Sequence, residues 1–351
     1  MTSIPSKMVG VQLIGHGGPE MLQINSDIEV PQSAAGEVLI KVSAAGVNNT
    51  DINTRNGWYS KNDNSSEDAG WSGTALQLPR IQGADVCGHI VAVGEGVAES
   101  RIGERVIVEP CIFELEGKEL EMPWYFGSEC DGGFAEYTKA QSKNAYRVDT
   151  SMTDVELASF PCSYSTAENM LTRAEVNEQD TVLVTGASGG VGSAAVQLAK
   201  ARGAKVIAVT SASKKQQLLD LGADVVLERS QNVVEALGHN SVTVVVDLVA
   251  GPAWPDLLNI LKRKGRYAVS GAIAGPMVEL DVRTLYLKDL SFFGCTFLEP
   301  EVFGNLVKRI ESGDIKPLVA ETYPLEEIGK AQESFQQKSH VGKIVLEVAG
   351  R

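Results

Sequence analysis

The sequence predicts an α/β protein that joins a doubly wound parallel sheet to an antiparallel, barrel-like β domain. From residue 181 onward, short apolar runs rich in β-branched residues alternate with helical segments, the pattern of parallel strands joined by crossover helices. Before residue 150, short strands are separated by glycine-rich turns, and a last strand at 343–348 returns to that style. We therefore expect the β domain over 1–150, completed by 299–351, and the parallel sheet over 151–298.

The elements expected in the β domain are short strands and one helix. Asn48 to Asp51 open the helix, because Thr50 and Asp51 are residue types that cap free N–H groups. Residues 56–80 and 109–131 are expected to be long loops. The first carries Trp58, Tyr59 and Trp71, so it is either a mobile surface loop or an aromatic lid over a substrate. The expected strands are 38–42, 90–94, 105–108, 134–137 and 145–148.

The second domain begins with helical composition at 155–160 and 166–173 and then alternates. Strands and helices are expected in turn, followed by a helix at 301–312 that we assign with the closing segment to the first domain. The strands are 182–185, 205–209, 225–227, 242–248, 267–270 and 290–297, and the helices are 193–202, 213–221, 231–237 and 254–262.

A glycine-rich turn joins the first of these strands to its helix. Gly186, Gly189 and Gly192 mark its corners, between the apolar run 182–184 and the helical segment that follows. A side chain at such positions would hold a phosphate away from the backbone, and the helix start offers N–H groups to an anion. Because strand and helix flank the glycines, the turn predicts a dinucleotide site in preference to an ordinary strand–helix turn.

The end of the second strand indicates which dinucleotide binds. An acidic residue there would accept hydrogen bonds from a ribose 2′-hydroxyl, and this chain instead has Ser211, Ser213 and Lys214. Hydroxyls and an ammonium group suit a 2′-phosphate, and Arg229 adds a second positive charge after the third strand. We therefore predict NADPH, although Ser213 and Lys214 would also suit a helix cap and a solvated helix face.

Composition excludes several classes of partner. The net charge of -14 argues against nucleic acid and against an anionic membrane surface. Neither a secretory leader nor an apolar run long enough to span a bilayer is visible. Five cysteines, an odd number spread along the chain, are typical of reduced thiols. We expect a cytoplasmic protein.

The order and spacing of several short motifs resemble the medium-chain dehydrogenase/reductase family, and in particular its zinc-independent quinone oxidoreductases. The resemblance implies a GroES-like β-barrel, a Rossmann domain and an active site in the cleft between them. It covers nearly the whole chain and rests on Ala45–Asp51, Gly83–Gly88, Gly132–Tyr137, the glycine turn, Leu221–Asp224, Gly265–Tyr267 and Val341–Val345.

The resemblance also identifies the positions that bind catalytic zinc in other members of the family. The cysteine two residues before the Thr-Asp pair is replaced by Asn48, and the His-Glu pair by Ala84-Asp85, whereas Cys162 matches the remaining cysteine. Catalytic zinc needs about three protein ligands, so we expect no metal. The four-cysteine structural zinc site is also missing, because residues 109–131 contain only Cys111 and Cys130.

For the site residues, the resemblance implies the following roles. Asn48 lines the substrate site, and Thr50, Tyr59 and Tyr164 are candidates for catalysis and proton donation, with water as an alternative and with a helix-capping role open for Thr50. Without a metal, the carbonyl is polarised by hydrogen bonds, which favours conjugated acceptors. Cofactor-binding residues are expected to be Thr166, Gly186, Ser188, Gly189, Gly190, Val191, Gly192, Ser211, Ser213, Lys214, Arg229, Gly271 and Lys343.

The expected function is NADPH-dependent reduction of a quinone or an α,β-unsaturated carbonyl. One alternative is an alcohol dehydrogenase whose degraded site still binds metal. Another is an NADPH-binding protein without catalytic activity, since a fold does not fix a function. Members of the family usually form dimers or tetramers, so we expect a homodimer or homotetramer, in which the strand at 290–297 would pair across an interface.

Overall fold

A computed structural model describes residues 4–60, 70–73, 75–115 and 117–348 of the 351-residue chain. The chain divides into two compact units, which are described separately. Unit 1 consists of 1–162, 317–339 and 343–351, and unit 2 of 163–316 and 340–342. Together they have the predicted α/β composition, with a β-rich first part and an alternating second part.

Unit 1 is built on a seven-stranded sheet. Its neighbouring strands run antiparallel, apart from the parallel pair β17–β18 near the end of the chain. A second sheet has the order β2-β1-β4. The strands are β10 (Ala145–Arg147), β6 (Arg105–Val108), β5 (Cys87–Val93), β3 (Glu37–Gly46), β18 (Lys343–Glu347), β17 (Val319–Pro324), β9 (Tyr137–Gln141), β1 (Lys7–Leu13), β2 (Leu22–Glu29) and β4 (Arg80–Ile81).

Residues 109–131 contain a hairpin, so the prediction of a long loop there was wrong. Strands β7 (Cys111–Leu115) and β8 (Lys118–Tyr125) pair antiparallel, with Cys111 opposite Tyr125 and Ile112 opposite Trp124. Ile112 and Trp124 pack against the core of unit 1. The acidic and basic residues along the exposed face hide this alternation in the sequence.

The helices of unit 1 are short. α1 (Asn49–Arg55) has Asn48 as its N-cap, and the backbone N–H of Asn48 donates to Asp51 Oδ2 at 2.8 Å. Thr50 lies inside the helix and is not its cap. The others are α2 (Asp154–Leu157), α10 (Ile328–Gln337) and the 3₁₀ turns η1 (Pro19–Met21), η2 (Glu99–Arg101), η3 (Ser142–Asn144) and η5 (Leu325–Glu327).

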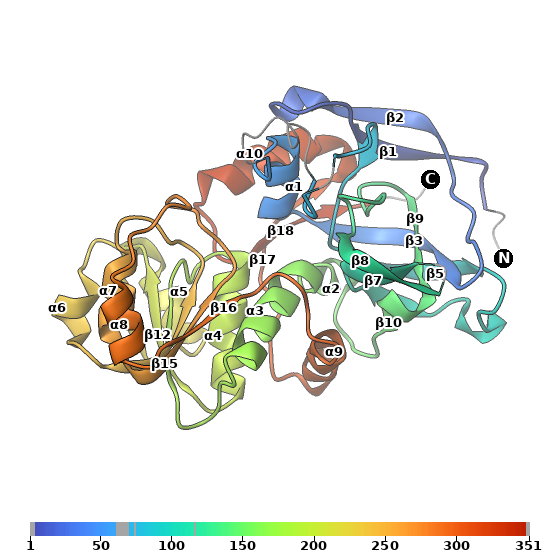
Figure 1. The fold of residues 1–351 in the computed structure, drawn as a ribbon. Helices are drawn as coiled ribbons and strands as arrows, with labels where there is room; N and C mark the ends of the chain where they lie inside the picture. Colours follow the sequence, from blue (N-terminus) through green and yellow to red (C-terminus); the bar gives the residue numbers. More distant parts are fainter. Residues whose placement is uncertain (1–3, 61–69, 74, 116, 349–351) are drawn as a thin grey trace. The chain divides into compact units, whose positions relative to one another are not determined.

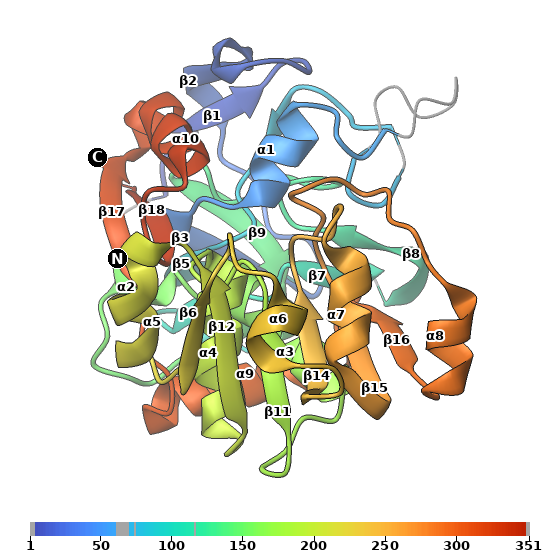
Figure 2. The same cartoon turned by 90° about the vertical axis from the view of Figure 1, so that its left-hand side faces the viewer.

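Unit 2 contains the predicted doubly wound sheet. Its six strands are all parallel, in the order β13-β12-β11-β14-β15-β16, and Figure 2 shows β12, β11, β14, β15 and β16 side by side. The order reverses between β11 and β14, which is where ligands bind in sheets of this kind. The strands are β11 (Thr181–Val184), β12 (Lys205–Thr210), β13 (Val225–Glu228), β14 (Val242–Asp247), β15 (Leu261–Val269) and β16 (Ser291–Gly294).

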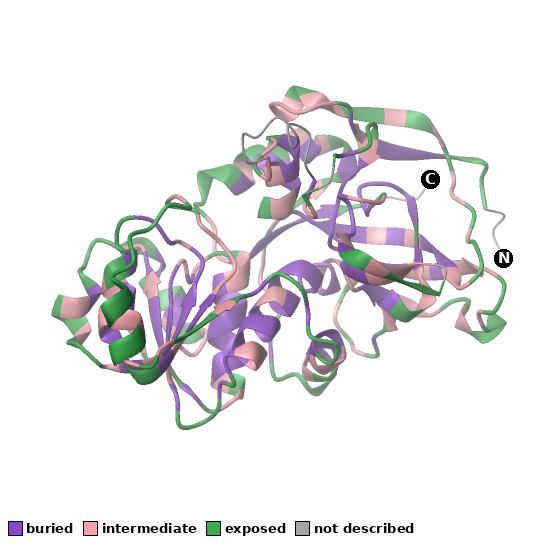
Figure 3. Ribbon diagram, viewed as in Figure 1, coloured by how far each residue is buried: buried purple, intermediate pink, exposed green. Residues whose placement is uncertain are grey.

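Helices cover both faces of this sheet, with α3 and α4 on one side and α7 and α8 on the other (Figure 1). Figure 3 shows the strands and α4 largely buried and α8 largely exposed. The sequence did not indicate α8. The helices are α3 (Pro161–Arg173), α4 (Gly190–Ala201), α5 (Lys215–Asp220), α6 (Val233–Leu237), α7 (Trp254–Ile260), α8 (Val282–Leu287), α9 (Val302–Ser312) and the 3₁₀ turn η4 (Ala212–Lys214).

The units change at 162/163 and 316/317, somewhat later than the predicted domain limits of 150 and 298. The helix expected at 301–312 is present as α9, but it belongs to unit 2 and not to the β domain. Arg309 of α9 lies 3.9 Å from Glu168 of α3, and Phe303 and Leu306 are buried. These contacts hold α9 in unit 2.

All five cysteines lie in the described part of the chain, and none forms a disulfide. No described helix combines the length and the apolar character that crossing a membrane requires.

Candidate functional site

The glycine turn of unit 2 brings backbone close to backbone. Gly186 has a φ of +57°, a left-handed conformation that favours glycine. A Cβ on Gly192 would lie 2.3 Å from the carbonyl oxygen of Gly186, so no larger residue fits there without moving the turn. A Cβ on Gly189 would meet nothing nearer than 3.6 Å. Gly192 thus allows the close backbone contact within the turn, whereas the space beside Gly189, at the start of α4, is open.

A buried carboxylate, that of Asp247, forms hydrogen bonds that link the ends of neighbouring strands next to this turn. Asp247, at the end of β14, accepts hydrogen bonds from the hydroxyls of Thr185 and Tyr267 at 2.6 Å each. The Thr185 hydroxyl oxygen in turn accepts from the backbone N–H of Leu248 at 2.9 Å. These bonds fix the two strands on either side of the point where the strand order reverses.

Lys214 lies beside the glycine turn, although it comes 22 residues after Gly192 in the sequence. Its Nζ is 3.5 Å from Ser188 Oγ, and the side chain is largely buried. Burial, and then the positive charge of Arg229, lower the pKa of Lys214. The hydroxyls of Ser211 and Ser213 lie 3.2 Å apart on the same connection. Two cations and two hydroxyls of the predicted phosphate site are therefore close together in unit 2.

A second polar cluster is buried in unit 1. Lys343, the first residue of β18, has its Nζ 2.8 Å from Asp85 Oδ2 and donates a hydrogen bond to Asn48 Oδ1. Asn48 Nδ2 donates to the same Asp85 oxygen at 2.8 Å. Lys343 is 1% exposed and Asp85 0%. The three side chains thus form a closed triangle that neutralises its own charge.

Cys162 adjoins this triangle. Its backbone N–H donates to the other Asp85 oxygen, Oδ1, at 2.6 Å, and its Sγ accepts from the Tyr125 hydroxyl at 3.1 Å. Burial, and then the charge of Asp85, raise the pKa of the Cys162 thiol to about 12, so the thiol is neutral at physiological pH. Asn48, Asp85 and Cys162, which are 37 and 77 residues apart in sequence, are therefore brought together.

Two more groups border the cluster. Burial raises the pKa of Asp51 to about 7, against the hydrogen bond that it accepts from the backbone of Asn48. The ring of Trp71 stacks on Tyr125 at a centroid distance of 4.6 Å. Trp71 is therefore half-buried and packed on Tyr125 of unit 1, while Trp58 is exposed. Residues 61–69 and 74 of the proposed lid lie outside the described residues, and the lid stays a prediction.

The candidate proton donors lie in different units of the chain. Tyr59 and Thr50 are paired in unit 1, where the Tyr59 hydroxyl donates to Thr50 Oγ1 at 3.2 Å. Burial raises the pKa of Tyr59. Tyr164 is fully buried in unit 2, where its hydroxyl donates to the carbonyl of Lys316 at 2.9 Å and accepts from Gln197 at 3.0 Å. That geometry gives Tyr164 a role in holding α3, α4 and the segment before residue 317 together.

The remaining predicted cofactor residues are also divided between the units. Thr166 lies in α3, and a Cβ on Gly271 would come within 2.9 Å of the Leu248 carbonyl, so this glycine allows a close backbone approach beside β14. Lys343 lies in unit 1, where its ammonium is held by Asp85 and Asn48. Tyr125 was not predicted, because the hairpin that carries it was taken for a loop.

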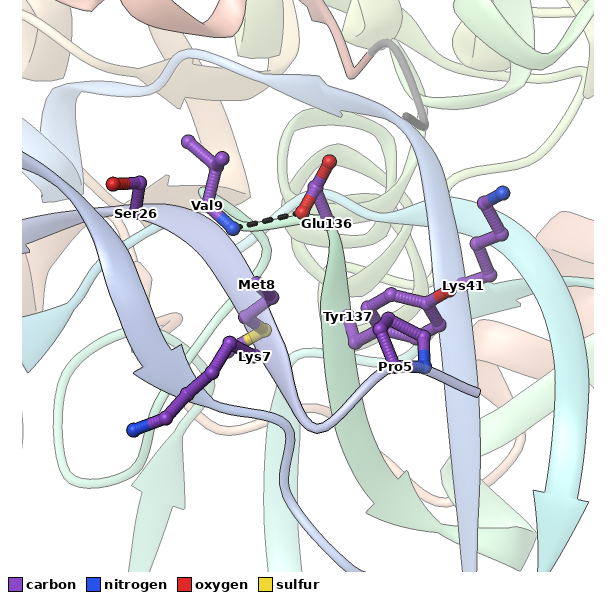
Figure 4. Close-up of a pocket in the computed structure, with 8 residues that line it drawn as sticks. All are labelled: Pro5, Lys7, Met8, Val9, Ser26, Lys41, Glu136 and Tyr137. Atoms are coloured by element: carbon purple, nitrogen blue, oxygen red, sulfur yellow. Dashed lines mark hydrogen bonds between the residues drawn. The ribbon is translucent and has the colours of Figure 1, made fainter. Parts of the chain in front are cut away.

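A cavity of about 220 Å³ in unit 1 is separate from these residues (Figure 4). It is lined by strand residues from β1, β2, β3 and β9 together with Pro5 and Glu136, and Figure 4 shows Glu136 bound to the backbone N–H of Val9. None of its lining residues belongs to the triangle or to the Cys162–Tyr125 pair.

The comparisons with known proteins agree with both units. Residues 34–150 match the family of alcohol dehydrogenase GroES-like domains, and 190–312 match the family of zinc-binding dehydrogenases. The GroES-like and Rossmann assignments are thereby confirmed.

Three relatives are similar over almost the whole chain. Acryloyl-coenzyme A reductase of Metallosphaera sedula is 33% identical over 91% of this chain and 95% of its own length. Human quinone oxidoreductase is 30% identical over 97% of each chain. A solved structure from Sinorhizobium meliloti 1021, described as a candidate alcohol dehydrogenase, is 49% identical, with a TM-score of 0.91 over 99% of this chain and 98% of that one.

Proposed function

Since the chain belongs to the medium-chain dehydrogenase/reductase family, we propose that it is an NADPH-dependent reductase of quinones or α,β-unsaturated carbonyls that works without catalytic zinc. The observation that carries the proposal is the triangle of Lys343, Asn48 and Asp85, in which an ammonium group contacts two residues that the resemblance matches to the metal-binding motifs of zinc-dependent members. Quinone oxidoreductase and acryloyl-coenzyme A reductase among the relatives support conjugated acceptors.

The residues at the zinc positions do not fit a catalytic zinc ion. Zinc in such sites takes about three protein ligands, which are thiolates, imidazoles or carboxylates. Here Asn48 contributes an amide, and the Asp85 oxygens already accept three contacts, one each from Lys343, Asn48 and Cys162. Among the described residues, no three His, Cys, Asp or Glu side chains form a group that could hold a metal.

Unit 2 supports a nicotinamide dinucleotide, and its charges favour the phosphorylated form. The opening beside Gly189 at the start of α4 suits the pyrophosphate, because helix N-termini attract anions. Lys214, Arg229, Ser211 and Ser213 suit a 2′-phosphate. When bound, the cofactor supplies the hydride.

We expect Lys214→Ala to weaken NADPH binding roughly ten- to a hundredfold, because a charge-assisted contact contributes about 1.5–3 kcal/mol. NADH affinity should be nearly unchanged, since NADH lacks the 2′-phosphate. Isothermal titration with both cofactors measures this. Lys215→Ala is the matched control, because Lys215 is the exposed neighbour and should affect neither cofactor. Equal weakening of NADPH and NADH by Lys214→Ala would contradict the proposed contact.

Reduction of a conjugated acceptor needs one hydride at carbon and one proton at the enolate that forms. The Tyr59–Thr50 pair suits the proton delivery, because burial keeps the Tyr59 hydroxyl protonated at physiological pH and Thr50 holds its hydrogen. Asn48 suits a positioning role, since both of its amide atoms are fixed by Lys343 and Asp85.

A panel of acceptors tests the proposed function. NADPH oxidation is followed with quinones, small enones and an enoyl-coenzyme A thioester, and metal content is measured on the same preparation. Turnover of at least one conjugated class without stoichiometric zinc supports the proposal. Alcohol oxidation with one zinc per chain would favour an alcohol dehydrogenase, which the zinc-binding dehydrogenase match and the Sinorhizobium meliloti relative also suggest. NADPH binding without turnover of any acceptor would favour a non-catalytic protein.

We also propose that the chain forms a homodimer or homotetramer through the edge of the unit 2 sheet. β16 is the last strand in the order, Phe292 within it is 37% exposed, and Leu287 of α8, the helix just before it, is 68% exposed. Patches of this kind mark interfaces. We expect light scattering coupled to gel filtration to give twice or four times the mass of the 37.4 kDa chain, and Leu287→Glu to lower it. A monomer would contradict the proposal.

A further inference from the structure

The Lys343 ammonium lies in a cluster with Asn48, Asp85 and Cys162, which come from three different segments of the chain. Asn48 precedes α1, Asp85 precedes β5, and Cys162 is the second residue of α3. One oxygen of Asn48 and one of Asp85 face the Lys343 Nζ, and the backbone of Cys162 is held to the other Asp85 oxygen at 2.6 Å. The amide oxygen and the carboxylate contact one ammonium group, and Cys162 is held to the same carboxylate, so the residues form a cation site in which the cation is the lysine side chain itself.

We propose that Lys343 is the fixed internal cation of this site, that it excludes a divalent metal, and that it positions the Asn48 amide. This inference rests on the proposed zinc-independent function and names Lys343 as the residue that prevents a metal from binding. It follows from the geometry that a metal can enter only if the ammonium leaves, because both would need the same Asp85 and Asn48 oxygens.

Charge balance explains why the ammonium stays. Asp85 is fully buried, and a buried carboxylate needs a positive partner. Within the described part of unit 1, Lys343 is the cation that contacts Asp85. A Cβ on Gly46 would lie 2.4 Å from Asp85 Oδ2, so the backbone of β3 closes this side of the carboxylate. The pair is therefore held at contact with little freedom to separate.

The orientation of Asn48 follows from the same contacts. Its Oδ1 faces the ammonium and its Nδ2 faces Asp85, so turning the amide by half a revolution would place its NH₂ group against the ammonium and its oxygen against the carboxylate. Asn48 is also the N-cap of α1, the helix that carries Thr50. Lys343 is thus a positioning residue that acts through Asn48 on the start of α1.

Cobalt binding tests the proposal by a readout that does not depend on turnover. Asn48→Cys provides a second thiol beside Asp85 and Cys162, which completes three ligands of the types that zinc and cobalt accept. Four proteins are compared by titration with Co²⁺ and the thiolate-to-cobalt absorption band: the wild type, Asn48→Cys, Asn48→Cys/Lys343→Ala and Asn48→Cys/Lys343→Arg. The last is the matched control, because it keeps a cation at position 343.

We expect the cobalt band at one equivalent only in Asn48→Cys/Lys343→Ala, with an affinity at least about a hundredfold above that of Asn48→Cys. We expect Co²⁺ to raise the melting temperature of that variant alone, so a double variant that folds only with Co²⁺ also supports the proposal. Cobalt binding by Asn48→Cys as tight as by the double variant would overturn it, as would a folded double variant without the band.

The cobalt titration tests the internal cation and the acceptor panel tests the proposed function, so either proposal can fail while the other stands. If no acceptor of the panel is reduced but only the Lys343→Ala double variant binds cobalt, the function fails and the internal cation stands. If acceptors are reduced but Asn48→Cys alone binds cobalt tightly, the function stands and the internal cation fails.

Discussion

A Lys343→Met variant is expected to lose about 3–5 kcal/mol of unfolding free energy, because it leaves the buried Asp85 carboxylate without its positive partner. Methionine is flexible and has nearly the length of lysine, so the loss reports the charge and not a cavity. Denaturant unfolding followed by tryptophan fluorescence measures it, since Trp58, Trp71 and Trp124 belong to unit 1 and Trp254 to unit 2.

Two controls separate this effect from the loss of any lysine. Lys139, in β9, lies 2.9 Å from Glu37 but is 42% exposed, so Lys139→Met should cost less than about 1 kcal/mol. Asp85→Asn/Lys343→Met removes both charges, and we expect it to be more stable than the sum of the two single losses predicts, because no buried charge is left unpaired. A loss for Lys343→Met no larger than that for Lys139→Met would refute the buried pair.

The glycine turn and the alternating sheet could be predicted from the sequence because both depend on neighbours in the chain. Strand β11, Gly186 and helix α4 follow one another between residues 181 and 201, and the conformation of each depends on its own residue types. The approach of Lys214 to Ser188 was partly predictable for the same reason, since the connection after β12 must lie beside the turn after β11 in a parallel sheet.

The triangle in unit 1 depends on contacts between distant segments, and the sequence indicated only part of it. Asn48 and Asp85 were identified at positions of lost metal ligands and Cys162 as the ligand that is kept, but Lys343 was assigned to the cofactor. No periodicity relates residue 343 to residues 48 and 85, and only the pairing of β18 with β3 brings them together. Tyr125 was missed because charged residues along β8 obscure the alternation of a strand.

The assignment of α9 shows the same limit. Its amphipathic pattern was enough to predict a helix, yet the unit that it joins is decided by Arg309 meeting Glu168 and by the buried face around Phe303. A sequence pattern specifies that a face is apolar but not which surface it covers.

Gly189→Val is expected to abolish binding of the dinucleotide while leaving unit 2 folded. The backbone of Gly189 has φ −73° and ψ 174°, which any residue adopts, and its Cβ position is open to 3.6 Å. The branched side chain would therefore fit the protein but fill the space at the start of α4 that the pyrophosphate needs. We expect NADPH affinity to fall by more than about a hundredfold in calorimetric titration, whereas the melting temperature without cofactor should stay within a few degrees.

Gly192→Ala is the matched comparison, and the opposite pattern is expected from it. Its Cβ would lie 2.3 Å from the Gly186 carbonyl oxygen and 2.7 Å from Ala187 Cα, both backbone atoms that cannot turn aside. Even one methyl group must open the turn, at a cost of about 1–3 kcal/mol in the unfolding free energy of unit 2. Loss of binding in this variant therefore accompanies lost stability, and only Gly189 isolates the phosphate contact. If folded Gly189→Val bound NADPH with wild-type affinity, the glycine turn would be a structural corner and not a cofactor site.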